Sequence, residues 1–387
     1  MNKIYKVIWS KVRNCYVAVS EIAKRNGKGG SEVNCGEKAN RRCVALSLAL
    51  ALCVTGGTVF TTPQVAMAAD IAITSGSETI NDATHAADDY YLNGSNITFT
   101  VTAGGVVNSI SGSSDAAVSG NTVTINGGTV NHADTDWSET SPGSGNWVGK
   151  PNLTGGFSTS GAVIGNQVSI TNATLSGYYP TAYGGYSQTG NVSKNSVTFE
   201  GGVNEKLYIN GGFSATGVAG GDTAADGNIV TIKSGTVNFV AGGYSERGSA
   251  KNNQVSVSGG TVNAEVYGGY VGGGTGEATN NKVEISGGTV GSSVYGGYSY
   301  TGTAEGNNVN VTGGHIAGAV YGGKIYGDST NNTGAVIKNI VSVSGSGTQI
   351  DGEVHGGSSI WGKVDGNKVT ISNGTLRYVR GGRSSYG

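Results

Sequence analysis

The sequence predicts an all-β protein built as a parallel β-solenoid (a β-helix) of about nine rungs, each of about 28 residues, behind a cleavable export signal. Three observations support this fold class. Glycine accounts for 70 of the 387 residues and only 13% are charged, which excludes a coiled coil; glycine also lacks the three-residue period of collagen. Two short units alternate strictly through most of the chain. Within each unit apolar and polar residues alternate, as in a strand with one buried face.

The first unit reads Asn-x-Val-x-(Ile/Val/Phe), and the second places an apolar and a variable residue before Gly-Gly, usually followed by Tyr or Phe and then Ser. The first unit begins at Asn121, Asn166, Asn195, Asn228, Asn253, Asn281, Asn307, Asn339 and Asn367. The glycine pairs of the second begin at Gly155, Gly184, Gly211, Gly242, Gly268, Gly296, Gly322, Gly356 and Gly381. Neither unit can bury a core alone, whereas stacked rungs bury a continuous apolar column.

Equivalent residues of stacked rungs lie above one another, so the sequence predicts files of like side chains. Val255 and Val257 face inward, and Thr261-Val262 supplies a third short strand. The repeated asparagines form an amide ladder. The aromatic residues form one file of Tyr267, Tyr295 and Tyr321 and a second of Phe157, Tyr186, Phe213, Tyr244, Tyr270 and Tyr298. We interpret both files as structural, with a ligand-binding aromatic strip as the alternative.

Two regions break the period. Residues 69–120 are rich in Thr and Ser and lack the full repeat, so we expect an N-terminal cap before the repeats of 121–387. An insertion at 132–151 carries Trp137 and Trp147 in a polar loop. Loops that leave a regular scaffold often carry specificity, which makes these two residues a candidate ligand-contact loop; the alternative is that both indoles pack on the rod.

The N-terminal 68 residues read as an export signal. Ten of the 24 Lys and Arg residues lie in residues 1–42 against three Glu, and residues 43–68 carry no charge. The apolar run in 43–68 is shorter than the ~20 residues that span a bilayer, and Ala66-Met67-Ala68 is the small-x-small motif that signal peptidase cleaves after. Lipoprotein and twin-arginine signals fit less well, because the residues around Cys53 and Arg41-Arg42 lack the rest of those patterns.

About 40 residues precede that apolar run, more than a simple signal peptide needs. The motifs NKIYKVIW and VAVSE within the first 28 residues resemble the extended signal peptide region (ESPR) of type V secretion proteins. The resemblance implies an autotransporter passenger, a Gram-negative-type envelope and an extension that limits premature folding in the periplasm. It also implies the Sec translocon and an outer-membrane β-barrel translocator as partners.

The exported part offers little chemistry, so we expect no enzyme, cofactor or metal. All four Cys precede residue 69, and the four His (His85, His132, His315 and His355) show no metal-ligand spacing. Gly327-Asp328-Ser329 lacks the rest of a serine-hydrolase motif. The carboxylates that a β-helix lyase would need are dispersed at Asp222, Asp226 and Asp365.

These observations predict a secreted or surface-displayed passenger that acts in adhesion, aggregation or biofilm contact, with a host or bacterial surface ligand. A passenger hydrolase or polysaccharide lyase, and an exoprotein of two-partner secretion, are the alternatives. The near-zero net charge of −1 gives no reason to expect nucleic acid. Because the sequence ends within a repeat and lacks the strands of a translocator, we expect an incomplete chain. The ligand, and a monomer or a trimer, stay open.

Overall fold

The structure is a computed structural model that describes residues 69–131, 152–177, 180–327 and 334–386, with the backbone of four further short strands. The chain divides into two compact units, Met1–Thr62 and Pro63–Gly387. In the first unit, β1 (Tyr5–Ser10) and β2 (Cys15–Ser20) pair antiparallel. The predicted apolar run and the cleavage motif Ala66-Met67-Ala68 lie outside the described residues.

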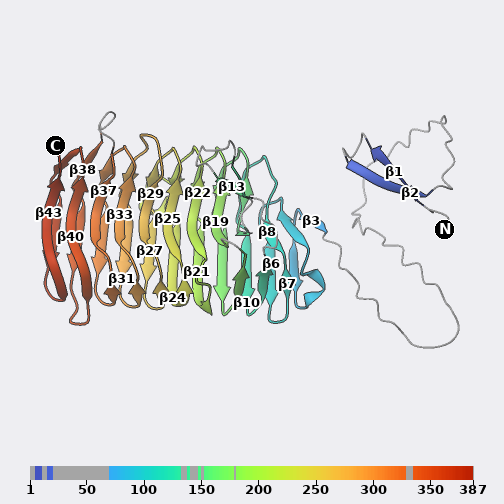
Figure 1. Cartoon of the computed structure of the whole chain (residues 1–387), viewed down its shortest axis with the longest axis horizontal. Coiled ribbons are helices and arrows are strands. Elements are labelled where there is room, and N and C mark those ends of the chain that lie inside the picture. The colour runs from blue at the N-terminus through green and yellow to red at the C-terminus, as the bar shows by residue number, and fades with distance from the viewer. Residues whose placement is uncertain are drawn as a thin grey trace. The chain divides into compact units, whose positions relative to one another are not determined.

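The second unit is a parallel β-solenoid, which confirms the predicted fold class (Figure 1). Each coil pairs in parallel with the coils before and after it, as β31 (Lys282–Ile285) does with β27 (Gln254–Val257) and β35 (Asn308–Val311). The described residues contain no α-helix, and their two 3₁₀ turns are η1 (Ala83–His85) and η2 (Ala224–Asp226).

Four series of strands run along the solenoid. The Asn-adjacent series consists of β4 (Ser77–Ile80), β6 (Thr98–Thr102), β10 (Thr122–Asn126), β17 (Gln167–Thr171), β21 (Ser196–Val203), β24 (Ile229–Val237), β27, β31, β35, β39 (Ile340–Val343) and β42 (Lys368–Ile371). From β10 on, each of these strands directly follows a repeated asparagine. The predicted Thr-Val strand forms the second series, with β7 (Val106–Val107), β11 (Thr129–Asn131), β18 (Thr174–Ser176), β28 (Thr261–Val262), β32 (Thr289–Val290) and β36 (His315–Ile316).

The third series, which we call the glycine-pair series, carries the second repeat unit from β14 on. It consists of β3 (Asp70–Ile73), β5 (Asp89–Leu92), β8 (Ser109–Ser111), β14 (Leu153–Thr154), β15 (Phe157–Ser158), β19 (Thr181–Ser187), β22 (Tyr208–Ser214), β25 (Phe239–Ser245), β29 (Val266–Val271), β33 (Val294–Ser299), β37 (Val320–Ile325), β40 (Gln349–Ser359) and β43 (Thr375–Ser384). A fourth, short series has β9 (Val118–Ser119), β16 (Val163–Ile164), β20 (Val192–Ser193), β23 (Ala219–Gly220), β26 (Ala250–Lys251), β30 (Ala278–Thr279), β34 (Ala304–Glu305), β38 (Ala335–Ile337) and β41 (Lys363–Asp365).

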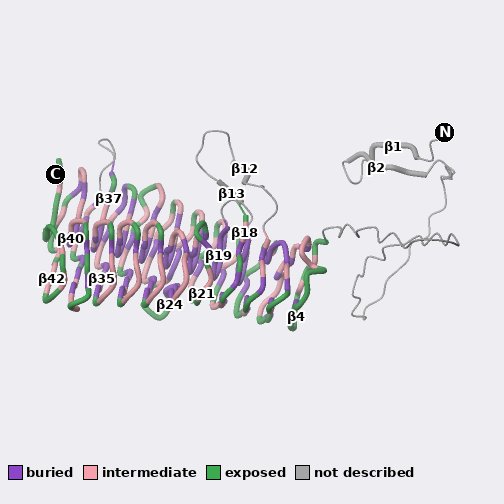
Figure 2. Tube along the Cα trace, turned by 60° about the horizontal axis from the view of Figure 1, so that its bottom comes forward, coloured by how far each residue is buried: buried purple, intermediate pink, exposed green. Residues whose placement is uncertain are grey.

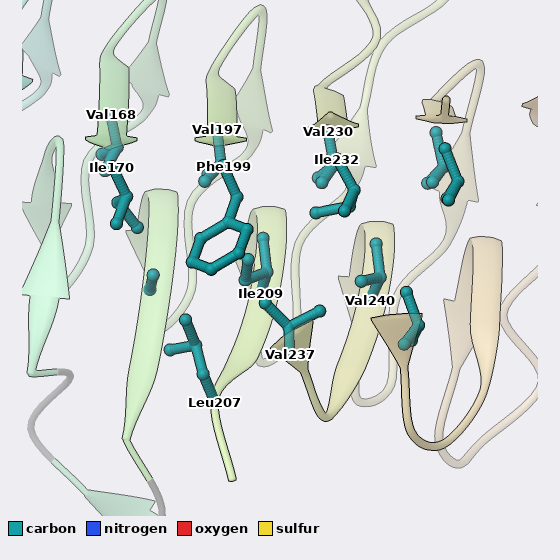
Figure 3. Close-up of a cluster of buried hydrophobic side chains, with 14 of the residues drawn as sticks. Val168, Ile170, Val197, Phe199, Leu207, Ile209, Val230, Ile232, Val237 and Val240 are labelled. Atoms are coloured by element: carbon teal, nitrogen blue, oxygen red, sulfur yellow. The ribbon is translucent and has the colours of Figure 1, made fainter. Parts of the chain in front are cut away.

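The apolar core fills the interior between these series, where side chains from different faces meet (Figure 3). Val255 and Val257 of β27 are fully buried, as predicted, while the residues between and beside them are partly exposed. Phe199 and Leu207 are among the largest fully buried side chains. Figure 2 shows how buried and more exposed segments alternate along each coil.

The length of a coil differs between the two ends of the solenoid. Hydrogen-bonded partners in neighbouring repeat coils are 25 to 33 residues apart, with 45 where the insertion intervenes. Within residues 69–120 the hydrogen-bonded partners are 19 to 24 residues apart. This segment nevertheless supplies strands to the same sheets, since β3 pairs with β5 and β4 with β6. Ile71 and Ile73 of β3 pack against the core and cover part of its first layer.

The predicted asparagine ladder is present and runs through all nine repeats. In Asn281, the side-chain oxygen Oδ1 accepts the backbone N–H and the Nδ2–H of Asn253, both at 3.0 Å. Its own backbone N–H and Nδ2–H donate to Oδ1 of Asn307 at 3.0 and 2.9 Å. Nδ2 also donates to the carbonyl of Ala250 in the short series at 2.9 Å. Eight of the nine ladder asparagines, all except Asn367, are wholly buried, and the hydrogen bonds of their amides offset the usual cost of burying them.

The turn before each ladder asparagine explains the Asn-Asn, Gly-Asn and Lys-Asn pairs of the sequence. The preceding residue has positive φ at eight of the nine positions, namely Gly120, Gly165, Lys194, Asn252, Asn280, Gly306, Lys338 and Gly366. Glycine enters this left-handed region freely, and Asn does so more readily than most other residues. The turn places the asparagine side chain inside the coil.

The glycine pairs are required by this ladder. A Cβ at Gly297 would lie 2.5 Å from Cγ of Asn307, well inside van der Waals contact. Gly269 and Gly323 face the amides of Asn281 and Asn339 in the same way. The strand therefore passes directly over the amide only because it carries no side chain there.

Candidate functional site

The predicted ligand-contact loop contains a two-stranded antiparallel ribbon. β12 (Trp137–Glu139) pairs with β13 (Trp147–Gly149), with Trp137 opposite Gly149 and Glu139 opposite Trp147. The two tryptophans therefore lie on neighbouring strands of one hairpin. Their side chains lie outside the described residues, and the ligand-contact role remains a prediction.

The histidines of the described residues each pair with one carboxylate. His85 Nδ1 lies 2.9 Å from Asp88, and His315 Nε2 lies 2.8 Å from Asp351. His355 Nε2 lies 2.8 Å from Glu353. Across the described ranges no three His, Cys, Asp or Glu side chains come together as a metal site.

Two of the three carboxylates considered for a lyase, Asp226 and Asp365, have local partners. Asp226 accepts the Thr223 hydroxyl and pairs with Lys194 at 3.1 Å, and these contacts lower the pKa of its carboxyl. Asp365 pairs with Lys363 at 3.0 Å, which lowers its pKa in the same way. Asp328 and Ser329 lie outside the described residues.

The two predicted aromatic files lie on the outward side of the glycine-pair series. Tyr267 and Tyr295 stack with centroids 4.7 Å apart, and Tyr295 and Tyr321 with centroids 5.1 Å apart. In the second file, Tyr186 stacks between Phe157 and Phe213. The two files also touch, since Tyr267 and Tyr270 lie 4.7 Å apart across the glycine pair. We call this continuous surface the aromatic strip.

The rings of the aromatic strip cover one another. Tyr295 is only 8% exposed although it points away from the core, and burial raises its pKa to about 12. Because stacked rings hide their faces, they expose little of the π-surface that a sugar ring would need. The packing therefore supports the structural interpretation of the interior of the strip.

The strip changes from aromatic to basic toward β43. The position of Tyr298 is taken by Lys324 in the next coil, and after Ser358 by Arg383. Lys324 Nζ lies 4.6 Å from the centroid of the Tyr321 ring, a cation–π distance. Burial and the neighbouring Arg383 lower the pKa of Lys324. Among the described residues neither Lys324 nor Arg383 has a carboxylate within ion-pair distance.

The other file ends in a histidine and an arginine. His355 takes the position after Tyr321 and stacks on its ring at 4.9 Å. The His355 side chain is 1% exposed, and burial lowers its pKa, so the ring is neutral with Nε2–H donating to Glu353. Its Nδ1 has no hydrogen-bond partner in the described part of the chain. Arg380 follows His355 and lies 3.4 Å from Glu353.

Sequence reasoning missed this basic end, which we call the basic patch: Lys324, Arg380 and Arg383. The signal was present, because Lys324 and Arg383 replace the tyrosine after a glycine pair. An alignment of the repeats on their glycine pairs would have placed the charges in one file. Prediction stopped at the aromatic members.

The described residues include no helix long and apolar enough to cross a membrane. Residues 1–53 match the model of the family described as the Extended Signal Peptide of Type V secretion system. No curated protein and no solved structure matches the chain.

The match confirms the resemblance stated on the N-terminal motifs: the chain begins with an autotransporter-type extended signal peptide. Together with the β-solenoid it defines a type V secreted protein with a β-helix passenger. Such a signal implies Sec-dependent export and a type V translocator, toward the cell surface or the extracellular space.

Proposed function

We propose that the passenger is a non-catalytic rod at the cell surface that acts in adhesion, aggregation or biofilm contact, and that it binds an acidic surface polysaccharide. The observation that carries the proposal is the basic patch at the end of the aromatic strip. Its Lys324 and Arg383 lie in one file of one sheet, on β37 and β43, with Ser358 of β40 between them.

The charge distribution supports an anionic ligand. The chain from residue 69 on has 14 basic and 22 acidic residues, so a group of three basic side chains contrasts with the net negative charge of this part of the chain. Lys324 is held over Tyr321 and kept partly away from water, which strengthens its attraction for an anion. Arg383 adds a planar guanidinium, which binds carboxylate or sulfate groups in a two-point geometry.

The repetitive architecture supports adhesion over catalysis. A rod whose coils stack at about 4.8 Å presents its side chains in register, and a polymer with repeated charges engages several of them together. Individually weak contacts then add to a stable attachment.

Binding of the exported, processed protein to immobilised acidic and neutral polysaccharides tests the proposal. We expect binding to the acidic polymer only, weakened by salt because the contacts are ionic. The triple variant Lys324→Gln, Arg380→Gln, Arg383→Gln should lose at least about tenfold in affinity, the equivalent of about 1.4 kcal/mol.

A matched control removes the same charge elsewhere. The variant Lys233→Gln, Lys251→Gln, Lys282→Gln loses three lysines, each paired with a glutamate on another part of the surface. It should bind like the wild type. Equal losses in both variants, or no binding of the wild type to any acidic polymer or cell, would overturn the proposal.

A further inference from the structure

Ala69 is the residue that directly follows the predicted cleavage motif, and it is tied to the second coil by both of its backbone groups. Its N–H donates to Oδ1 of Asp88 at 3.1 Å. Its carbonyl accepts the backbone N–H of Asp89 at 2.9 Å. β3 begins at the next residue and pairs in parallel with β5.

Asp88 is a buried carboxylate whose only ion-pair partner within the described part of the chain is a histidine. It is 8% exposed, and its second oxygen, Oδ2, lies 2.9 Å from Nδ1 of His85, which also lies 3.0 Å from the Tyr90 hydroxyl. His85 is charged only when protonated. No Lys or Arg of the described residues pairs with Asp88. A buried carboxylate without a permanent cation is costly, because burial penalises its charge.

We propose that removal of the signal peptide creates the missing cation: the new α-ammonium group of Ala69 forms an ion pair with Asp88 and fixes the first coil. Hydrolysis adds one water to the peptide bond between Ala68 and Ala69. Ala68 leaves with a carboxylate, and the nitrogen of Ala69 becomes an amine that takes up the released proton at neutral pH. The inference rests on the predicted cleavage after Ala68 and is independent of the proposed adhesion.

The change at this nitrogen is large although no other atom need move. Before cleavage it is a neutral amide with one N–H. Afterwards it is an ammonium with three donors, 3.1 Å from the same oxygen if the coil stays in place. Charge-assisted hydrogen bonds are about twice as strong as neutral ones. The first coil is therefore more stable in the processed chain than in the chain that still carries its signal.

Because the ion pair between Ala69 and Asp88 lies in the first coil, it affects how the N-terminal end of the solenoid folds. Ile71 and Ile73 of the first coil pack on the core, and β3 pairs with the strand beneath it. Weak docking of this coil before cleavage leaves the first core layer uncovered, whereas firm docking afterwards covers it. Processing by signal peptidase would then also complete the N-terminal end of the solenoid.

The test uses the processed protein recovered after export. Mass spectrometry first establishes whether the chain begins at Ala69. Acylation of the α-amine at mildly acidic pH then reports how free that amine is, with the unfolded protein as reference. In the wild type we expect a rate about tenfold below that of Asp88→Asn, because an ion-paired ammonium must lose its partner and its proton to react.

Asp70→Asn is the matched control. It removes a carboxylate one residue from the same terminus, whose described hydrogen bond is with the Tyr91 hydroxyl at 3.2 Å rather than with Ala69. It should react like the wild type. A chain with one alanine inserted before Ala69 keeps Asp88 but displaces the amine, so it should react at the rate of Asp88→Asn even if that variant folds poorly.

Hydrogen exchange of the Asp89 backbone N–H, which donates to Ala69, provides a second readout. It should be faster in Asp88→Asn than in the wild type. A processed chain that begins elsewhere, or equal acylation rates in the wild type, Asp88→Asn and the insertion variant, would overturn the inference.

Discussion

Residue identity varies much less on the inner side of each glycine pair than on its outer side. Inside, the asparagine ladder keeps the same residue at nine consecutive repeats. Outside, the adjoining file runs through Phe, Tyr, Lys, Ser and Arg. The same backbone thus supports an invariant file and a variable one, separated by the thickness of a strand.

Hydrogen-bond stoichiometry accounts for the difference. A ladder amide must accept two bonds and donate three, counting its backbone N–H, and an amide of this length alone supplies that pattern without charge. The outer file requires only packing, which many side chains provide. The comparison predicts a falling series of effects as substitutions move from the ladder to the surface.

Asn281→Leu should have the largest effect. It leaves the backbone N–H and Nδ2–H of Asn253 and the Ala250 carbonyl without their partner in a buried site. At about 1–3 kcal/mol for an unsatisfied buried group, the free energy of local opening should fall by about 3–5 kcal/mol. Amide hydrogen exchange of β27 and β31 measures it. A loss below about 1 kcal/mol would contradict the role given to the ladder.

Gly297→Ala should follow. Its Cβ would overlap the Asn307 amide, and we expect a cost of about 2–3 kcal/mol, within the range seen for overpacked interiors. Gly347→Ala is the control, because a Cβ there has nothing within 4 Å. Thermal unfolding of both variants should show a clear decrease in Tm for the first and almost none for the second. Equal decreases in Tm would contradict the claim that Gly297 is required by the close approach to the Asn307 amide.

The outer file should respond to alkaline pH. Burial raises the pKa of Tyr295 to about 12, while the unfolded chain ionises near 10. Above pH 10 the unfolded state therefore loses its proton first, and stability falls as pH rises toward 12, by about 1.4 kcal/mol at pH 11 for this residue. Denaturant unfolding of the wild type and Tyr295→Phe across this range tests the sign. Identical pH profiles would show that Tyr295 is not protected.

The smallest effect belongs to the polar surface. Lys282 and Glu284 form an ion pair at 2.6 Å with both side chains substantially exposed. Water and salt screen such a pair, so Lys282→Gln should change the unfolding free energy by no more than about 0.5 kcal/mol. Denaturant titration at low and high salt measures it. A loss comparable to that of Gly297→Ala would invert the proposed order.

Much of this architecture could be predicted from the sequence because the same residue pattern recurs in each repeat. The spacing of Asn281 and Asn307 and the alternation at Val283 and Ile285 determine which side chains stack and which face inward. The Thr-Val strands and both aromatic files followed from the same rule. In a periodic sequence, residues one repeat apart lie at equivalent positions, so their contacts can be predicted from the repeat length.

The missing parts lack such a signal. The short series has strands of two or three residues, such as Ala278–Thr279, too brief for a pattern of alternation. A serine file was also missed: Ser187 Oγ accepts the N–H of Gly190 at 2.9 Å and donates to the Gly161 carbonyl at 3.0 Å. In a glycine-rich chain a Ser-x-x-Gly spacing is too common to predict that contact. The pairing of Ala69 with Asp88 depends on one irregular coil and repeats nowhere.

Backbone hydrogen exchange of the ladder asparagines tests the central claim most directly. Their N–H groups donate to a side-chain oxygen of the next coil, as from Asn281 to Asn307. We predict that these amides exchange as slowly as those of the core valines, and that Asn307→Leu releases the Asn281 amide before any other in its coil. Rapid exchange of the ladder amides in the wild type would contradict the account.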